Sequence, residues 1–346
     1  MPRQDFRICS LRARFTFALV IVVALFSIGV SAQIVVPLTM TETPQQTYKA
    51  MLEVGIGSLP PLSLVFDTGS LGLELYATPG IPGNGTTCSD QPISVSYGNP
   101  KQVTYSGVIC SGSMNFAGVI STPSIPFGLL TSLTYCAPDY QCNTPQQNYA
   151  AGIYGVFGVG IFPAPGVNLP NPLRTLPGVY GERFTVRLNA STIEPNSLIL
   201  GSPWRYDAAI FPQSTESTGV LGLPLYSEGQ GCVLVNGQQT SVCPTVVFDT
   251  GNPVPFVHVT IPGLPTVVGS NGDTYVAPGT TIGLAPRVGG PSAVTLVATD
   301  SFAGEFPYAN QNDNLINAGI QAFFGNDVTY NGEQGVITVG SCTPNE

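Results

Sequence analysis

The stretch LVFDTGSL (64–71) and the stretch TVVFDTGNP (245–253) carry nearly the same phrase, once in each half of a chain of 346 residues. In both copies an apolar pair precedes Asp-Thr-Gly, and a small polar residue follows. The apolar pairs predict buried strand ends, and each glycine permits the tight turn after the aspartate. The repeat therefore predicts two similar lobes that each contribute one aspartate, Asp67 and Asp249.

Two aspartates brought face to face have a specific chemistry. Neighbouring carboxylates do not both ionise, so they share one proton. The ionised member acts as a general base on a water molecule, and the protonated member acts as an acid toward a substrate carbonyl. We therefore expect Asp67 and Asp249 to be catalytic, with no cofactor and no metal. The alternative is that both motifs are only strand-to-turn junctions, because Asp-Thr-Gly favours turns.

The residues that flank the aspartates have supporting roles in this hypothesis. The two threonines exchange hydrogen bonds across the interface between the lobes, and the two glycines shape the turns. Ser70 donates a hydrogen bond to the carboxylate that it follows. The predicted supporting set is Thr68, Gly69, Ser70, Thr250, Gly251 and Asn252.

Composition predicts an all-β protein. Hydrophobic residues make up 43% of the chain and charged residues only 9%, while 40 glycines and 32 prolines are spread among the apolar residues. That mixture is typical of short strands joined by turns. One short helix is expected, within residues 314–324. The segments that predict strands are MLEVGIG, LSLVF, ISVSY, FTVRL, SLILG, CVLVNG, TVVFD and GVITVG.

The first 32 residues have the pattern of a secretory signal. Four arginines precede the apolar run FTFALVIVVALFSIGV, which closes on the small pair Ser31-Ala32. A membrane span needs about 20 apolar residues, so cleavage after Ala32 is favoured over a retained anchor. We expect residues 1–32 to be a signal peptide, residues 33–201 to form the lobe with the first motif, and residues 202–346 to form the lobe with the second.

Charge limits the partners of the mature protein. The formal net charge is −9, and loss of the signal removes four of the 11 basic side chains. Nucleic acids and anionic lipids are bound by clusters of basic side chains. We expect a polypeptide substrate, no nucleic acid and no membrane in the mature form. We also expect a monomer that is secreted, whether extracellular, periplasmic or at the cell surface.

The cysteines of an exported chain favour disulfides over metal ligands. The loop CAPDYQC is bracketed by one pair, and the turn Asn236-Gly237 predicts a hairpin that joins another. Cys342 is left over, and connectivity is not fixed by sequence. His258 is the only histidine and no CxxC occurs, which argues against a metal site. The candidate pairs are Cys136 with Cys142, Cys232 with Cys243, and Cys88 with Cys110.

These motifs give the chain a resemblance to the pepsin-like aspartic proteases. YKAMLEVGIGSLPPLSLVFDTGS resembles that family's opening, ISVSYG the start of its flap hairpin, and YGVFGVG and NSLILGS later parts of its first lobe. CVLVNGQQTSVCPTVVFDTG and NAGIQAFFGNDVTYNGEQGVITVG resemble its second lobe. The resemblance implies a bilobal all-β fold, two β-barrel-like lobes around an active-site cleft, with Tyr97 as the flap tyrosine. It also matches Gly319 and Tyr330 to positions in the closing segment.

The chain departs from the family pattern at several points. Glu74 stands where a tryptophan usually holds the flap tyrosine, so Tyr97 needs a different partner. Asn252 stands where serine or threonine is usual, and its amide donates with a longer reach. The dozen residues after Ala32 lack lysine and arginine, unlike a basic prosegment. The pattern is also similar, more loosely, to the mycobacterial PE-type aspartic proteases, which suggests a divergent and possible bacterial branch.

The sequence thus predicts a secreted aspartic endopeptidase that cleaves internal peptide bonds with activated water. A catalytically silent protein of the same fold, serving as an inhibitor, receptor or surface protein, is the alternative. A third reading is a protease that processes itself or acts on one exported partner. The two intact aspartates favour the enzyme, whereas Glu74 and Asn252 keep the alternatives open.

Overall fold

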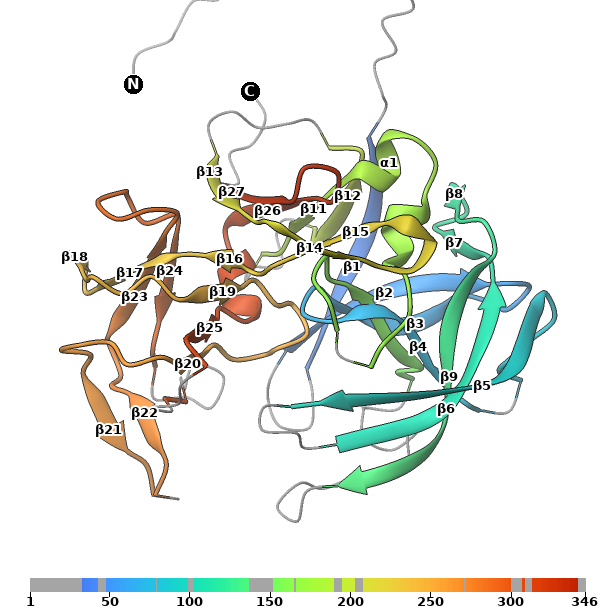
Figure 1. Cartoon of the computed structure of the whole chain (residues 1–346), viewed down its shortest axis with the longest axis horizontal. Helices are drawn as coiled ribbons and strands as arrows, with labels where there is room; N and C mark the ends of the chain where they lie inside the picture. Colours follow the sequence, from blue (N-terminus) through green and yellow to red (C-terminus); the bar gives the residue numbers. More distant parts are fainter. Residues whose placement is uncertain are drawn as a thin grey trace, which may run out of the picture. The chain divides into compact units, whose positions relative to one another are not determined.

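Figure 1 shows a protein built mainly from short strands, and the predicted all-β class is confirmed. The computed structural model describes residues 33–42, 48–78, 80–98, 103–136, 152–164, 166–189, 195–202, 208–270, 272–299, 307–308 and 313–341. The predicted signal (1–32), Cys142 and Cys342 lie outside these ranges. None of the helices within them is long and apolar enough to cross a membrane. All contacts described below lie within the unit Ala32–Glu346.

The first half of this unit contains the strands β1 to β12. Each strand is short and rich in apolar or β-branched residues, and a helical turn (Pro172–Thr175) and α1 (Val179–Glu182) precede β11. The strands are β1 (Ile34–Glu42), β2 (Tyr48–Ile56), β3 (Leu62–Asp67), β4 (Leu71–Tyr76), β5 (Thr86–Tyr97), β6 (Val103–Gly112), β7 (Met114–Phe116), β8 (Ile120–Ser121), β9 (Ile125–Cys136), β10 (Gly155–Val159), β11 (Arg183–Arg187) and β12 (Ser197–Leu200).

The second half contains β13 to β27, arranged in several smaller sheets and one shared sheet. The strands are β13 (Ala209–Pro212), β14 (Thr215–Thr218), β15 (Pro224–Tyr226), β16 (Gly229–Gln230), β17 (Cys232–Val235), β18 (Gln238–Gln239), β19 (Thr245–Val247), β20 (Phe256–His258), β21 (Thr266–Val268), β22 (Thr274–Val276), β23 (Thr281–Ala285), β24 (Val294–Val297), β25 (Leu315–Asn317), β26 (Asn326–Asn331) and β27 (Val336–Ser341). Each of the eight segments that predicted strands overlaps one of the strands of the two halves.

The same three-strand arrangement occurs in both halves. In the first half, β10 pairs in parallel with β3, which ends at Asp67, and antiparallel with β4, which follows the turn. In the second half, β25 pairs in parallel with β19 and antiparallel with β20. Parallel neighbours run in the same direction, so the two parallel strands of each arrangement end on the same side. In both halves the Asp-Thr-Gly turn lies at that end.

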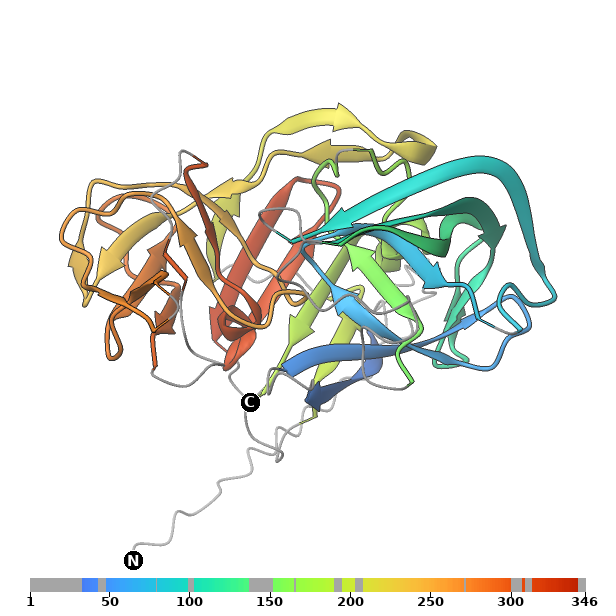
Figure 2. The ribbon, with the colours of Figure 1, turned by 90° about the horizontal axis from the view of Figure 1, so that it is seen from below.

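Strands from both halves form one continuous sheet. Its order is β13-β27-β26-β11-β12-β1-β2-β3-β10-β4-β9-β6-β5. Figure 2 shows β26 and β27, in red, between the orange strands of the second half and the blue and green strands of the first. The predicted boundary at residue 201 falls just after β12, and the sheet continues across it, because β11 pairs with β26. That boundary remains a prediction.

The core fills the space behind the two aspartates. Phe66, directly before Asp67, is fully buried and stacks on Phe157 of β10. Phe248, directly before Asp249, is also buried and meets Phe211 edge-on. Each such side chain stabilises the fold by about 1.5–3 kcal/mol through burial. The apolar pair before each aspartate therefore anchors it to a packed core.

The short helix expected within residues 314–324 is present, but it occupies only part of that range. Residues Leu315–Asn317 instead form β25, and only Ile320–Phe323 turn, as a short 3₁₀ helix. The strand prevails because it pairs with both β19 and β20. Tertiary pairing therefore overrides the weak local preference for a helix.

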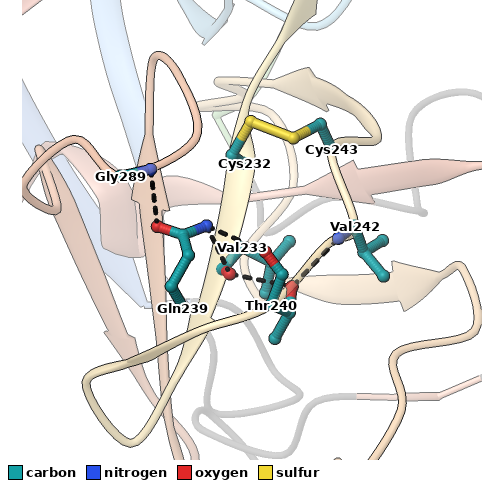
Figure 3. Close-up of a disulfide and its surroundings, with 7 residues drawn as sticks. All are labelled: Cys232, Val233, Gln239, Thr240, Val242, Cys243 and Gly289. Atoms are coloured by element: carbon teal, nitrogen blue, oxygen red, sulfur yellow. Dashed lines mark hydrogen bonds between the residues drawn. A yellow bond between two sulfur atoms is a disulfide. The ribbon is translucent and has the colours of Figure 1, made fainter.

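Two disulfides lie within the described residues. Cys88–Cys110 joins the neighbouring strands β5 and β6, and Cys232–Cys243 closes the hairpin of β17 and β18. Figure 3 shows the second hairpin, where Thr240 and Gln239 both donate to the carbonyl of Val233. Cys136 is also disulfide-bonded, and its predicted partner Cys142 lies outside the described residues.

Candidate active site

The two Asp-Thr-Gly turns meet at one point. A Cβ atom added to Gly69 would overlap the carboxyl group of Asp249, and one added to Gly251 would overlap that of Asp67. Neither glycine has the positive φ at which a side chain is strained whatever the space. Each glycine is therefore matched to the aspartate of the other half, and its missing side chain makes room for that carboxylate.

The threonines hold the turns together through a reciprocal exchange. The backbone N–H of Thr68 donates to Oγ1 of Thr250 at 3.1 Å, and the N–H of Thr250 donates to Oγ1 of Thr68 at 2.9 Å. Each hydroxyl then donates to the other half, Thr68 to the carbonyl of Phe248 and Thr250 to that of Phe66. Both threonines are fully buried. Buried, fully paired hydrogen bonds of this kind fix the relative position of the aspartates.

A buried tyrosine donates a hydrogen bond to the strand end that precedes the second turn. The hydroxyl of Tyr330 on β26 donates to the carbonyl of Phe248 at 2.7 Å. Its ring stacks on Phe184 of β11, with centroids 4.9 Å apart. Burial raises the pKa of Tyr330, so its hydroxyl stays protonated and keeps donating. Tyr330, which the resemblance matches to a position in the closing segment, thus links the sheet shared by both halves to the strand end before Asp249.

The environment of Asp67 favours its protonated form. Burial, and then the charge of Asp249, raise the pKa of Asp67 to about 7. A hydrogen bond between the two carboxyl groups acts in the same direction, while Lys49 and Ser70 oppose it. Oγ of Ser70 nevertheless makes no hydrogen bond of normal geometry within the described residues. Burial and the charge of Asp249 therefore affect the pKa of Asp67 more than Ser70 does.

The two carboxylates have unequal sets of donors. Asp67 accepts a bond from the backbone N–H of Gly69 at 2.7 Å. Asp249 accepts from the N–H groups of Gly251 at 2.8 Å and Asn252 at 3.1 Å. The side-chain Nδ2 of Asn252, expected to donate to the carboxylate, has no partner within the described residues. The backbone of Asn252 therefore supplies the donor.

Sequence reasoning missed two side chains beside the aspartates. Asn317, on β25, donates from Nδ2 to Oδ2 of Asp249 at 2.7 Å. Lys49, on β2, donates from Nζ to the carbonyl of Gly251 and interacts with the charges of both aspartates. Burial lowers the pKa of Lys49. One signal was available, because Lys49 is one of only two lysines in the chain.

Glu74 is the partner of Tyr97. The hydroxyl of Tyr97 at the end of β5 donates to Oε2 of Glu74, and the ring meets Tyr105 edge-on. Glu74 is buried, which raises its pKa to about 8. The carboxyl group thus supplies the hydrogen-bond partner that the missing tryptophan would have supplied. Residues 99–102, between β5 and β6, lie outside the described residues.

We expect Glu74 to make the protein more stable in acid than at neutral pH. Its pKa rises from an ordinary 4.5 to about 8 on folding, so its contribution is present below pH 4.5 and is lost as pH rises toward 8. One such group changes the free energy of unfolding by at most about 1.4 kcal/mol per pH unit. Glu74→Gln keeps an acceptor for Tyr97 but does not titrate, so urea unfolding across this range should show a flatter pH dependence.

The matched control is Glu53→Gln, which changes an exposed glutamate on β2. It should leave the pH dependence of unfolding as in the wild type. An unchanged slope in Glu74→Gln as well would show that Glu74 ionises freely in the folded protein.

For the peptidase that the sequence predicts, activity should depend on both the hydroxyl and the ring of Tyr97. Tyr97→Phe removes the bond to Glu74 and should lower kcat/KM several-fold, whereas Tyr97→Ala removes the ring as well and should lower it at least about 10-fold. Peptide hydrolysis and thermal melting should be measured on one preparation, with Tyr135→Phe as the control, which changes a tyrosine on β9, two strands from β5 in the sheet. Lost stability with turnover preserved per folded molecule would remove Tyr97 from the site.

The described residues contain no group of three or more side chains suited to hold a metal ion. His258, on β20, is buried beside the ring of Phe256, and its Nδ1 lies 3.4 Å from Oδ2 of Asp313.

Comparison with solved structures identifies the fold. The structure of an aspartic proteinase from Irpex lacteus matches with a TM-score of 0.57 and 15% sequence identity, covering 90% of this chain and 97% of that one. The fold is the bilobal fold of the pepsin-like aspartic proteinases. No protein-family model matches the chain, and no curated protein matches it by sequence. Nothing in these comparisons supports the mycobacterial PE-type branch.

Proposed function

We propose that this protein is an aspartic endopeptidase whose catalytic residues are Asp67 and Asp249. The observation that carries the proposal is the position of each glycine against the opposite carboxylate, with the threonine exchange holding both turns. A fold shared at 15% identity supports the class of scaffold, and the chemistry depends on these two residues.

In the proposed reaction, a water molecule lies between the carboxyl groups. The ionised carboxylate takes a proton from the water while the water oxygen attacks the scissile carbonyl carbon. The protonated carboxyl donates its proton to the carbonyl oxygen. A tetrahedral diol forms. The proton taken from water then passes to the leaving amide nitrogen, the C–N bond breaks, and the other carboxyl recovers its proton from the diol. The dyad returns to its starting state without a covalent intermediate.

The substrate is an extended polypeptide that lies across both turns. A peptide in this conformation adds main-chain hydrogen bonds, as an added strand does. In this proposal Tyr97 covers the reacting centre. We propose that the mature protein is a secreted monomer of two lobes, 33–201 and 202–346, after removal of residues 1–32. The two described disulfides are compatible with an oxidising compartment.

One observation favours a catalytically silent binding protein as a second candidate. The side-chain amine of Lys49 interacts with both aspartates and already donates to the carbonyl of Gly251. When it is protonated, this amine stabilises the fully ionised pair, which has no proton to donate to a substrate.

Digestion of a denatured protein separates the two candidates. The purified chain should generate new internal peptide ends, detected by mass spectrometry, with more cleavage at acid pH than above about pH 7, and a statine-type inhibitor should suppress them because its hydroxyl imitates the tetrahedral intermediate. Absence of new ends at every pH between about 2 and 8, with the protein folded, would favour the silent candidate.

A further inference from the structure

Asn317 and Val156 occupy equivalent positions in the two halves. In the first half, Val156 on β10 pairs with Val65, two residues before Asp67. In the second half, Asn317 on β25 pairs with Val247, two residues before Asp249. The repeated scaffold therefore places an amide that contacts the second aspartate at the position where the first half has an apolar side chain packed against Met51 and Val65.

The amide of Asn317 is held in one orientation. Its Oδ1 accepts a bond from the N–H of Gly319 at 2.9 Å, so its Nδ2 is the group that faces Asp249. The side chain is buried, and its strand is paired on both sides, with β19 and β20. A donor fixed in this way lowers the free energy of the charged carboxylate without a rearrangement during the reaction.

The donors around the two carboxylates are unequal. Asp249 accepts two backbone N–H bonds and the amide bond of Asn317 within the described residues. Asp67 accepts one backbone bond, and even with the nearby Ser70 hydroxyl its donors are fewer. Hydrogen bonds donated to a carboxylate favour its ionised form. The imbalance favours ionisation of Asp249 over ionisation of Asp67.

We infer that Asn317 is a positioning residue that keeps Asp249 as the ionised member of the pair, so that Asp67 carries the shared proton. This inference rests on the proposed function and deepens it. Asp249 is then the base that takes a proton from water, and Asp67 is the acid that protonates the substrate carbonyl.

The other charged groups do not reverse this assignment. Lys49 interacts with Asp67 more than with Asp249, but burial lowers the pKa of Lys49 itself, which weakens its preference for either ionised carboxylate. Glu74 faces Asp67, and Glu228 interacts with Asp249, so each opposes ionisation of its own neighbour when it is charged itself. Tyr330 stays neutral behind both. With these charges distributed over both sides, the fixed donors decide which carboxylate ionises.

Asn317→Val gives the second half the residue of the first and tests the inference. Losing one donor to a charged group should raise the pKa of the pair, so the acid limb of kcat/KM against pH should move up by about one pH unit. We expect kcat to fall about 10-fold or more with KM within about two-fold, because the donor acts through Asp249. The control Asn331→Ala removes another buried asparagine, which bonds to the N–H groups of Glu333 and Gln334, and should leave the acid limb in place.

A second readout does not require peptidase activity. Carboxyl carbon NMR of the folded wild type, assigned with Asp67→Asn and Asp249→Asn, should show Asp249 ionising at lower pH than Asp67. In Asn317→Val, or in Asn317→Asp if the valine variant does not fold, the two titrations should move closer together. An unshifted acid limb in an active Asn317→Val, or ionisation of Asp67 first in the wild type, would overturn the inference. Titration in the expected order with no cleavage would instead remove the proposed function.

Discussion

Asp67→Asn and Asp249→Asn should each reduce peptide cleavage by at least about 1,000-fold, because general acid and base catalysis each contribute up to about 10⁴-fold. An amide neither takes a proton from water nor donates one as an acid. Each turn keeps its backbone hydrogen bonds, since the N–H of Gly69 or Gly251 still finds the amide oxygen as an acceptor, while Asp249→Asn loses the bond from Asn317. The fold should therefore survive the change.

Initial rates on a denatured protein and thermal melting should be measured for both variants. Because burial and the charge of Asp249 raise the pKa of Asp67, replacing either aspartate should also weaken the fall in stability as pH rises toward 7. Asp90→Asn, which changes an exposed aspartate of β5, is the matched control and should keep wild-type activity. Near wild-type activity in either dyad variant would exclude the dyad.

Gly69→Ala and Gly251→Ala should abolish activity for a different reason. In each case the new methyl group would occupy the volume of the opposite carboxyl group. Because the turns are fixed by the threonine exchange, the carboxylate must turn away or the two halves must separate. A displacement of about 1 Å costs on the order of 100-fold in rate, so an overlap with the carboxylate itself should cost more.

The control for this steric argument is Gly55→Ala on β2. Gly55 also has an ordinary φ, and its added Cβ would meet its nearest neighbour, the Cβ of Asn115, at 3.6 Å, which is normal contact. Hydrolysis rates should be compared across the three alanine variants. Full activity in Gly251→Ala would mean that Asp67 does not lie against that turn.

Much of this site is predictable because its central motif occurs twice in the sequence. The repeated FDTG motif predicts the pairing of Asp67 with Asp249, since each copy combines a buried strand end with a turn. The threonines and glycines follow from the same repeat. The strands follow from their alternating or β-branched composition, and the hairpin of Cys232 and Cys243 follows from its Asn-Gly turn.

The missing parts depend on register and not on local pattern. Asn317 reaches Asp249 because β25 pairs with β19 in one particular register. The sequence around residue 317 does not predict that register. Lys49 meets the second turn although it lies on a strand of the first half. Glu74 was recognised as a departure, but its role as acceptor for Tyr97 needs the fold of β5 over β4. The roles that the sequence did not predict are therefore those that depend on contacts between segments far apart in the chain.

The most direct test is a crystal structure of the protein with a statine-type inhibitor. The account predicts that the inhibitor's hydroxyl lies between Asp67 and Asp249 and is within hydrogen-bonding distance, about 2.5–3.0 Å, of both carboxyl groups. In this complex Lys49 should no longer donate to the carbonyl of Gly251, which should instead accept a hydrogen bond from the inhibitor's main chain. An inhibitor bound elsewhere, or carboxyl groups too far apart to share one hydroxyl, would contradict the account.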